Sequence, residues 1–247
     1  MHYIAIIPAR YQSTRFPGKP LALLGTKPII QHVYEHVCTA LEHAWVATDD
    51  ERIANAVTGF GGKVIMTRND HQSGTDRCAE AAEKISAFFD FDVIINIQGD
   101  EPFVRREQLE ALKGCFADPD TQIATLIKKA EKSADLFNPN RPKVVIDKQQ
   151  YALLFSRTAI PFIRGKEQQE WISSHPFYCH LGMYAYRKNI LKEITKLKPS
   201  SLELAESLEQ LRWMENGYKI KTAVTTFESI GIDTPEDLES ARKLVIR

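Results

Sequence analysis

Several absences exclude specialised classes of protein. The four cysteines, at positions 38, 78, 115 and 179, form no C-x-x-C pair, so neither a zinc site nor a thioredoxin-like site is predicted. No apolar run approaches the roughly 18 residues of a membrane-spanning helix, and the apolar start 3–7 is too short for a signal peptide. We therefore expect a cytoplasmic protein with free thiols and no membrane partner.

Net charge is also absent, because 32 Lys and Arg balance 32 Asp and Glu. General nucleic-acid binding needs a net basic face, so no nucleic-acid partner is expected. With 247 residues, 43% of them hydrophobic, the chain can bury a core without disulfides or a structural metal. One large domain, or one domain with an inserted lobe, is expected.

A local absence marks the N-terminus. The first 34 residues contain no Asp or Glu, where average composition would put about four. Within them, loop 8–20 carries Arg10, Arg15 and Lys19 beside Ser13. A cationic loop after a strand is where open α/β proteins bind phosphates, and a solvated basic loop is the alternative. Its sequence fits neither a Walker loop nor G-x-G-x-x-G.

The first half of the chain alternates between apolar, mostly β-branched runs and segments with helical periodicity. This alternation predicts a three-layer, Rossmann-like α/β fold with a mostly parallel sheet. The expected strands are 3–7, 44–48, 64–66 and 92–97, and the expected helices are 29–41, 51–57, 76–89 and 106–116.

The pattern changes after a strand at 123–127. A hairpin of 143–146 with 151–156, followed by a strand at 181–186, predicts a smaller antiparallel lobe. Residues 164–176 are polar and are expected to form a surface loop. Leu204, Leu208 and Leu211 are spaced as the apolar face of one helix from 201 to 216, and strand 220–224 and helix 235–245 follow.

Two carboxylates are candidate magnesium ligands. Asp100 follows strand 92–97 in the motif Q-G-D-E-P, although an acidic turn explains it equally. Thr234, Pro235 and Asp237 fit a capped helix start, which leaves Asp233 unexplained. Magnesium prefers one or two carboxylates together with phosphate oxygens and water, so both are candidates.

Two further groups of polar residues have open interpretations. In segment 70–77, Ser73 or Thr75 caps the next helix, or the small-residue turn lies against a nucleobase. In the lobe, polar side chains adjoin apolar runs: they either belong to the core and a solvated helix face, or line a sugar-acid pocket with Arg157 on the carboxylate. The other candidates for that pocket are His180, Tyr184, Glu209 and Gln210.

Eight motifs, in order along nearly the whole chain, resemble those of the 3-deoxy-manno-octulosonate (Kdo) cytidylyltransferases, or CMP-Kdo synthetases. This family has a nucleotidyltransferase fold and is related to the CMP-sialate synthetases. The motifs are I-I-P-A-R-Y-x-S-T-R-F-P-G-K-P (6–20), V-A-T-D-D (46–50), M-T-R-x-D-H-Q-S-G-T-D-R (66–77), Q-G-D-E-P (98–102), A-L-L-F-S-R (152–157), H-L-G-M-Y (180–184), L-E-Q-L-R (208–212) and G-I-D-T-P-E-D-L (231–238).

The resemblance implies transfer of CMP from CTP to Kdo with Mg²⁺, in a homodimer. A single nucleotidyltransferase domain is expected, with 1–130 and 218–247 as the nucleotide-binding core and about 131–217 as a lobe for sugar binding and dimerisation. The implied residues are Arg10, Ser13, Arg15 and Lys19 for the triphosphate, Asp100 and Asp233 for magnesium, Ser73, Gly74 and Arg77 for cytidine, and Gln98, Arg157, His180, Tyr184, Glu209 and Gln210 for Kdo.

Of these residues, Arg10, Lys19, Asp100 and Asp233 are the expected catalytic set, and no Ser or Cys nucleophile is needed. Two other functions remain open. One is cytidylyl transfer to a different acid sugar, such as 8-amino-Kdo or sialic acid, which only the lobe residues would distinguish. The other is CTP binding without turnover, which would not require both Asp100 and Asp233.

Overall fold

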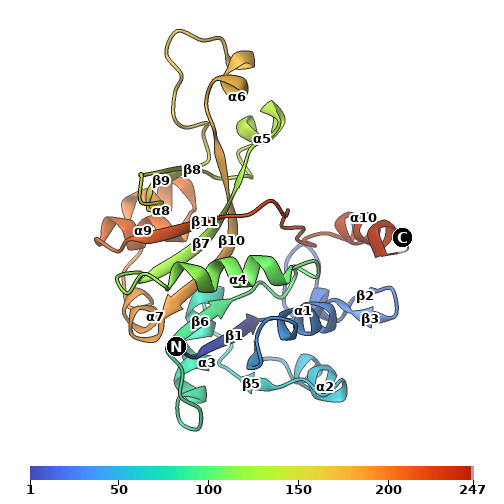
Figure 1. Cartoon of the computed structure of the whole chain (residues 1–247). Coiled ribbons are helices and arrows are strands. Elements are labelled where there is room, and N and C mark those ends of the chain that lie inside the picture. Colours follow the sequence, from blue (N-terminus) through green and yellow to red (C-terminus); the bar gives the residue numbers. More distant parts are fainter. Residues whose placement is uncertain (246–247) are drawn as a thin grey trace. The chain divides into compact units, whose positions relative to one another are not determined.

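The computed structural model describes residues 1–245, so residues 246–247 of the predicted core segment 218–247 lie outside the described residues. The chain divides into two compact units, which Figure 1 shows as ribbons. The predicted assignment of binding roles to 1–130 with 218–247 and to about 131–217 stays a prediction. Unit 1 is Met1–Glu110, Arg187–Thr195 and Ser229–Arg247, and unit 2 is Ala111–Tyr186 and Lys196–Glu228.

Unit 1 contains the predicted parallel sheet. Its strands lie in the order β6 (Val93–Asn96), β1 (Tyr3–Pro8), β4 (Ala44–Thr48) and β5 (Val64–Met66). The central strands are buried on both faces, as their continuous hydrophobicity predicts. The expected α/β architecture is confirmed. The unit's helices are α1 (Ile29–Cys38), α2 (Glu51–Gly59), α3 (Gly74–Ile85), the first half of α4 (Arg106–Cys115), α7 (Lys188–Ile194) and α10 (Pro235–Val245).

A short antiparallel pair and a 3₁₀ turn follow the first strand of unit 1. The pair is β2 (Leu23–Leu24) with β3 (Lys27–Pro28), and the turn η1 (Lys19–Leu21) precedes it. The pair is too short to leave a strand signal in the sequence. No helix among residues 1–245 is both long and apolar enough to cross a membrane.

Unit 2 is mainly antiparallel, as predicted. β7 (Ile123–Lys129) pairs antiparallel with β10 (Tyr178–Arg187) and parallel with β11 (Ile220–Val224). β8 (Lys143–Ile146) and β9 (Ala152–Ser156) form the expected hairpin. The short helices are α5 (Ser133–Phe137), η2 (Gln168–Glu170), α6 (Trp171–Ser174), α8 (Ser201–Glu206) and α9 (Glu209–Glu215).

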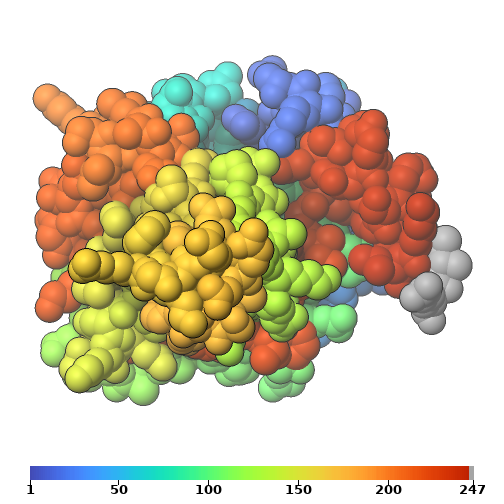
Figure 2. Space-filling model, turned by 90° about the horizontal axis from the view of Figure 1, so that it is seen from above, coloured from blue at the N-terminus to red at the C-terminus, as the bar shows by residue number. Residues whose placement is uncertain are grey.

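The segment 164–176 was predicted to be a surface loop, and this is only partly right. It contains η2 and α6, and the Trp171 side chain that begins α6 is only 4% exposed. Trp171 packs in a small core with Leu136 of α5 and Phe177. Figure 2 faces this gold segment and the yellow-green α5 beside it. One large aromatic ring anchors an otherwise polar segment.

The prediction of a single helix from 201 to 216 is wrong, because two helices, α8 and α9, lie in that range. Ser207 adopts a left-handed conformation (φ 50°) and separates α8 from α9. Leu208 and Leu211 are buried, but Leu204 is 70% exposed and does not share their face. The Arg157 guanidinium accounts for the break, because it donates to the carbonyls of Glu206 at 2.6 Å and Ser207 at 3.1 Å.

Candidate active site

A cleft of about 260 Å³ opens at the carboxyl ends of β1 and β6, beside the N-terminus of α3. Open α/β sheets bind ligands at this edge. Gly99 lets the strand ends approach, because a Cβ there would lie 2.8 Å from the Pro8 carbonyl oxygen. The predicted site residues that line the cleft are Arg10, Ser13, Arg15, Lys19, Ser73, Gly74, Arg77, Gln98, Asp100 and Asp233.

The cationic loop has a defined shape. Gly18 has a φ of 73°, its N–H donates to the Tyr11 carbonyl at 2.8 Å, and a Cβ on it would lie 3.0 Å from the Tyr11 ring. The Arg52 guanidinium covers that ring at 3.3 Å from the centroid. Arg10 forms no ion pair with any residue within 1–245, so its guanidinium is available to a phosphate.

Lys19 brings the two candidate metal ligands together from distant parts of the sequence. Its Nζ lies 2.5 Å from Asp100 Oδ2 and 3.1 Å from Asp233 Oδ1. Arg15 Nη2 also lies 3.1 Å from Asp233 Oδ1, and its side chain is 63% exposed. The predicted cap of α10 is confirmed, since Asp237 N–H donates to Thr234 Oγ1. Asp233 precedes this cap with its carboxylate turned toward Lys19, which supports its assignment to the site.

The donor set fits a magnesium ion. Both carboxylates approach a single cation, the Lys19 ammonium, so a divalent cation can also be reached by both. Among the described residues no group of three or more His, Cys, Asp or Glu side chains forms a site that a metal could occupy. An ion held by two carboxylates would take its remaining ligands from phosphate oxygens and water, as Mg²⁺ prefers.

Glu101, the next residue after Asp100, has a carboxyl group with a raised pKa. Burial raises the pKa of Glu101 to about 7, and the charge of Asp100 acts in the same direction, against a hydrogen bond with Ser229 that lowers it. Near neutral pH, Glu101 is therefore only partly ionised. This difference favours Asp100 over Glu101 as the ligand of a cation.

The candidate base-binding turn is a helix N-terminus. Ser73 caps α3, because its Oγ accepts from Asp76 N–H at 3.1 Å, while Asp76 accepts from Ser73 N–H at 3.2 Å. Arg77 is 5% exposed, and its Nη1 donates to Thr67 Oγ1 at 2.6 Å. The capping interpretation is confirmed for Ser73, and it leaves the cleft side of this turn open to a ligand.

Comparison with known proteins identifies the family. A model of the family described as Cytidylyltransferase matches residues 4–220. A 3-deoxy-manno-octulosonate cytidylyltransferase from Parabacteroides distasonis is 61% identical over 245 residues, which are 98% of this chain and 97% of that protein. The same enzyme from Bacteroides thetaiotaomicron is 60% identical, over 99% of this chain and 98% of that protein.

The chain belongs to the cytidylyltransferase family. A solved structure described as CMP:2-keto-3-deoxy-manno-octonic acid synthetase complexed with CTP is similar to this cytidylyltransferase. The TM-score is 0.92 and the identity 43%, over 100% of this chain and 99% of that one. The family resemblance and the fold predicted from the sequence are thereby confirmed.

In unit 2 of this cytidylyltransferase, several buried polar atoms lack a hydrogen-bond partner among the described residues. Three of them belong to neighbouring parts of β10 and α9: Tyr184 Oη, Gln210 Nε2 and Trp213 Nε1. The rings of Tyr184 and Trp213 lie 5.1 Å apart, so two of the three side chains are neighbours. Buried polar atoms without partners indicate a bound water or ligand. Tyr184 and Gln210 were predicted as sugar contacts. Trp213 was not, because it lies just outside the motif L-E-Q-L-R (208–212).

The remaining predicted sugar residues differ in the contacts that their side chains make within the protein. The Arg157 guanidinium donates to the carbonyls of Pro139, Glu206 and Ser207, which leaves two of its five N–H groups without a partner among residues 1–245. His180 Nε2 lies 2.9 Å from Thr125 Oγ1. Glu209 lies 3.9 Å from Arg212 Nη2, and Gln98 lines the cleft of unit 1.

Burial lowers the pKa of His180 to about 3. Between about pH 6.5 and 3 the unfolded chain then binds a proton that the folded protein does not, so stability falls as the pH falls. As the pH falls, we expect the free energy of unfolding of the wild type to decrease more steeply than that of His180→Asn. The two slopes should differ by at most about 1.4 kcal/mol per pH unit. Urea unfolding between pH 4 and 8 measures this. Parallel curves would contradict it.

Proposed function

We propose that this chain transfers CMP from CTP to the anomeric hydroxyl of Kdo and releases pyrophosphate. The observation that carries the proposal is the approach of Asp100 and Asp233 to Lys19, in a cleft beside the loop of Arg10, Ser13 and Arg15. The relatives named 3-deoxy-manno-octulosonate cytidylyltransferase and the similar synthetase complexed with CTP support both substrates.

In this reaction the sugar hydroxyl oxygen forms a bond to the α-phosphorus. The bond from the α-phosphorus to the oxygen that bridges to the β-phosphorus breaks, pyrophosphate leaves with that oxygen, and the hydroxyl proton passes to solvent water. Negative charge develops on the phosphoryl oxygens and on the departing pyrophosphate. Arg10, Ser13, Arg15 and Lys19 line the cleft. In the proposed reaction the three cations offset that charge, and the Ser13 hydroxyl donates to the triphosphate. Positioning of the two substrates supplies the rest of the rate enhancement, without a protein nucleophile.

Asp100 and Asp233 would hold the magnesium ion that we propose as cofactor. When bound, the ion stabilises charge on phosphate oxygens and lowers the pKa of a hydroxyl that contacts it. Lys19 contacts both carboxylates, and it holds them in place while offering its ammonium group to the triphosphate.

The proposed cytidine contacts are Ser73, Gly74 and Arg77, which line the same cleft. We assign the sugar to Gln98 in unit 1 and, in unit 2, to Arg157, His180, Tyr184, Glu209 and Gln210. The unpartnered Tyr184 Oη and Gln210 Nε2 support this assignment, since sugar hydroxyls both donate and accept. The homodimer stays a prediction that sedimentation velocity can test.

Pyrophosphate release tests the function. Purified protein with CTP and Mg²⁺ is expected to release pyrophosphate with Kdo, and less with 8-amino-Kdo or sialic acid; UTP and ATP serve as base controls. Release with another acid sugar alone would keep the roles of Asp100 and Asp233 and overturn the sugar assignment. No release with any sugar, together with tight CTP binding, would favour a non-catalytic CTP-binding protein.

A further inference from the structure

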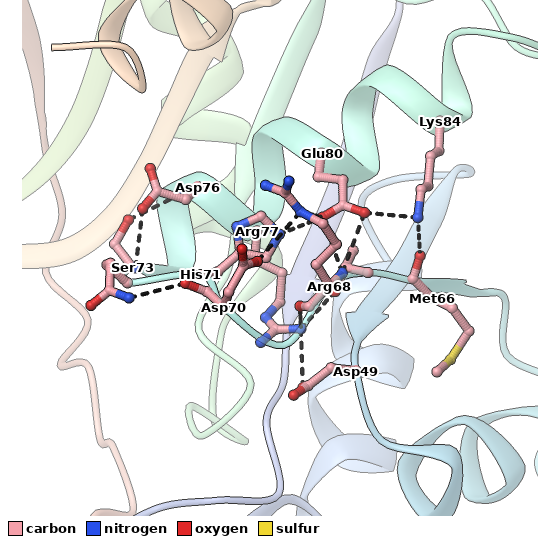
Figure 3. Close-up of polar contacts among 12 residues, drawn as sticks. Asp49, Met66, Arg68, Asp70, His71, Ser73, Asp76, Arg77, Glu80 and Lys84 are labelled. Carbon is pink, nitrogen blue, oxygen red and sulfur yellow. Dashed lines mark hydrogen bonds and ion pairs between the residues drawn. The ribbon is translucent and has the colours of Figure 1, made fainter.

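The loop 67–73 joins β5 to α3 and forms one wall of the cleft. His71, Gln72 and Ser73 of this loop line the cleft, together with Gly74 at the start of α3. Figure 3 shows that Glu80, farther along α3, turns its carboxylate back toward the loop. Glu80 itself is not among the described residues that line the cleft. The proposed phosphate chemistry therefore assigns no role to Glu80.

The Glu80 carboxylate holds several parts of the loop at once. Its Oε2 accepts from the backbone N–H of Arg68 at 3.1 Å and contacts Nε2 of His71. An ionised carboxylate can only accept, so this His71 nitrogen carries the proton. Its Oε1 lies 2.8 Å from Nζ of Lys84, which also donates to the Met66 carbonyl at 2.7 Å (Figure 3). One carboxyl group thus connects the strand end, the loop and α3.

The contact between Glu80 and His71 is largely shielded from water. The side chain of Glu80 is 15% exposed and that of His71 is 6% exposed. Burial raises the pKa of Glu80, but the donors Lys84, Arg68 and His71 outweigh it and lower the value to about 2. Glu80 is therefore a permanent anion at any pH at which the enzyme would work.

The Arg77 guanidinium makes a second set of contacts with the loop. Besides its bond to Thr67, Arg77 Nη1 lies 3.3 Å from the Arg68 carbonyl and 3.1 Å from Asp49 Oδ1. Arg77 also lines the cleft, whereas Glu80 does not, so a change at Glu80 alters the loop without removing a cleft residue. A base edge is distinguished by main-chain groups only when these are held within fractions of an ångström.

We propose that Glu80 is a positioning residue that holds loop 67–73 against the nucleobase and so sets the affinity and selectivity for CTP. The inference rests on the proposed function for the identity of the base. Glu80→Gln keeps the shape of the side chain but replaces one acceptor oxygen by an NH₂ group that faces other donors. Affinity is therefore expected to fall while the phosphate chemistry, which uses other residues, is preserved.

Calorimetry with CTP and UTP, and steady-state kinetics, test this proposal. Glu80→Gln is expected to weaken CTP binding and raise its KM about tenfold, with a smaller change for UTP and kcat within about twofold of the wild type. Glu83→Gln is the matched control, because Glu83 is exposed on the same helix and loses the same charge. It is expected to behave as the wild type.

His71→Asn removes one contact of Glu80 and leaves those of Lys84 and Arg68, so it keeps the proposal testable if Glu80→Gln does not fold. When Glu80→Gln and His71→Asn are combined, the loss of CTP affinity is expected to be smaller than the sum of the two single losses, expressed as free energies. Unchanged CTP affinity in Glu80→Gln, equal losses for CTP and UTP, a fall in kcat as large as the rise in KM, or full additivity would overturn the proposal. A wild type that binds CTP but transfers CMP to no sugar would overturn the proposed function and leave this binding test intact.

Discussion

Replacing Asp100 or Asp233 by Asn is expected to lower the kcat of CMP transfer by about a hundredfold or more. Asn keeps the shape of each side chain but removes one of the two charges that approach the same cation. The fold should remain intact, because the two side chains are 28% and 47% exposed and Asn oxygen can still accept from Lys19. Pyrophosphate release at saturating Mg²⁺ measures the loss.

Asp90→Asn is the control for this pair, since Asp90 is exposed in the same unit and loses the same charge. It should retain the turnover of the wild type, and all three variants should share its unfolding temperature within a few degrees. Wild-type turnover in Asp100→Asn or Asp233→Asn would refute the assignment of that carboxylate.

Lys19→Met is expected to cause the second large loss, with kcat/KM for CTP reduced about a hundredfold. Met keeps most of the apolar length but leaves no cation between Asp100 and Asp233, and none at this point for the triphosphate. Lys19→Arg should also be impaired, because a planar guanidinium does not reproduce the point charge of an ammonium.

Lys27→Met is the matched control, because Lys27 pairs with Glu35 in an exposed salt bridge, with both side chains 43% exposed. It removes the same charge from the same unit and should leave kcat/KM unchanged. If Lys19→Met and Lys27→Met gave equal activity, Lys19 would have no part in the reaction.

The parallel sheet, the cationic loop and the two candidate metal ligands could be predicted from local sequence, whereas Gln98 and Arg77 were assigned only through the family resemblance. The strands of unit 1 are buried on both faces, so their hydrophobicity is continuous. Asp233 could be singled out because the capping box explains Thr234 and Asp237 but not it. The family motifs added the pairing of Asp100 with Asp233, which no spacing along the chain would show.

Features set by distant contacts could not be predicted. The break at Ser207 depends on carbonyl contacts from Arg157, which is 50 residues away along the chain. Glu80 is an ordinary surface residue in a helical pattern until the folded loop brings donors to it. Trp171 and Trp213 stand in polar surroundings in the sequence, so their burial depends on tertiary packing.

The contact between Lys19 and Asp233 spans 214 residues of sequence, although both belong to unit 1. At ribosomal rates of about 5 to 20 residues per second, roughly 10 to 40 s separate the synthesis of these two residues. Throughout that interval the nascent chain presents an acid-free, cationic N-terminal loop without the Asp233 carboxylate that meets Lys19 and Arg15 in the folded protein. The proposed site is therefore completed late in synthesis, when the Ile232 N–H beside Asp233 bonds to the Asp100 carbonyl, in a segment made much earlier.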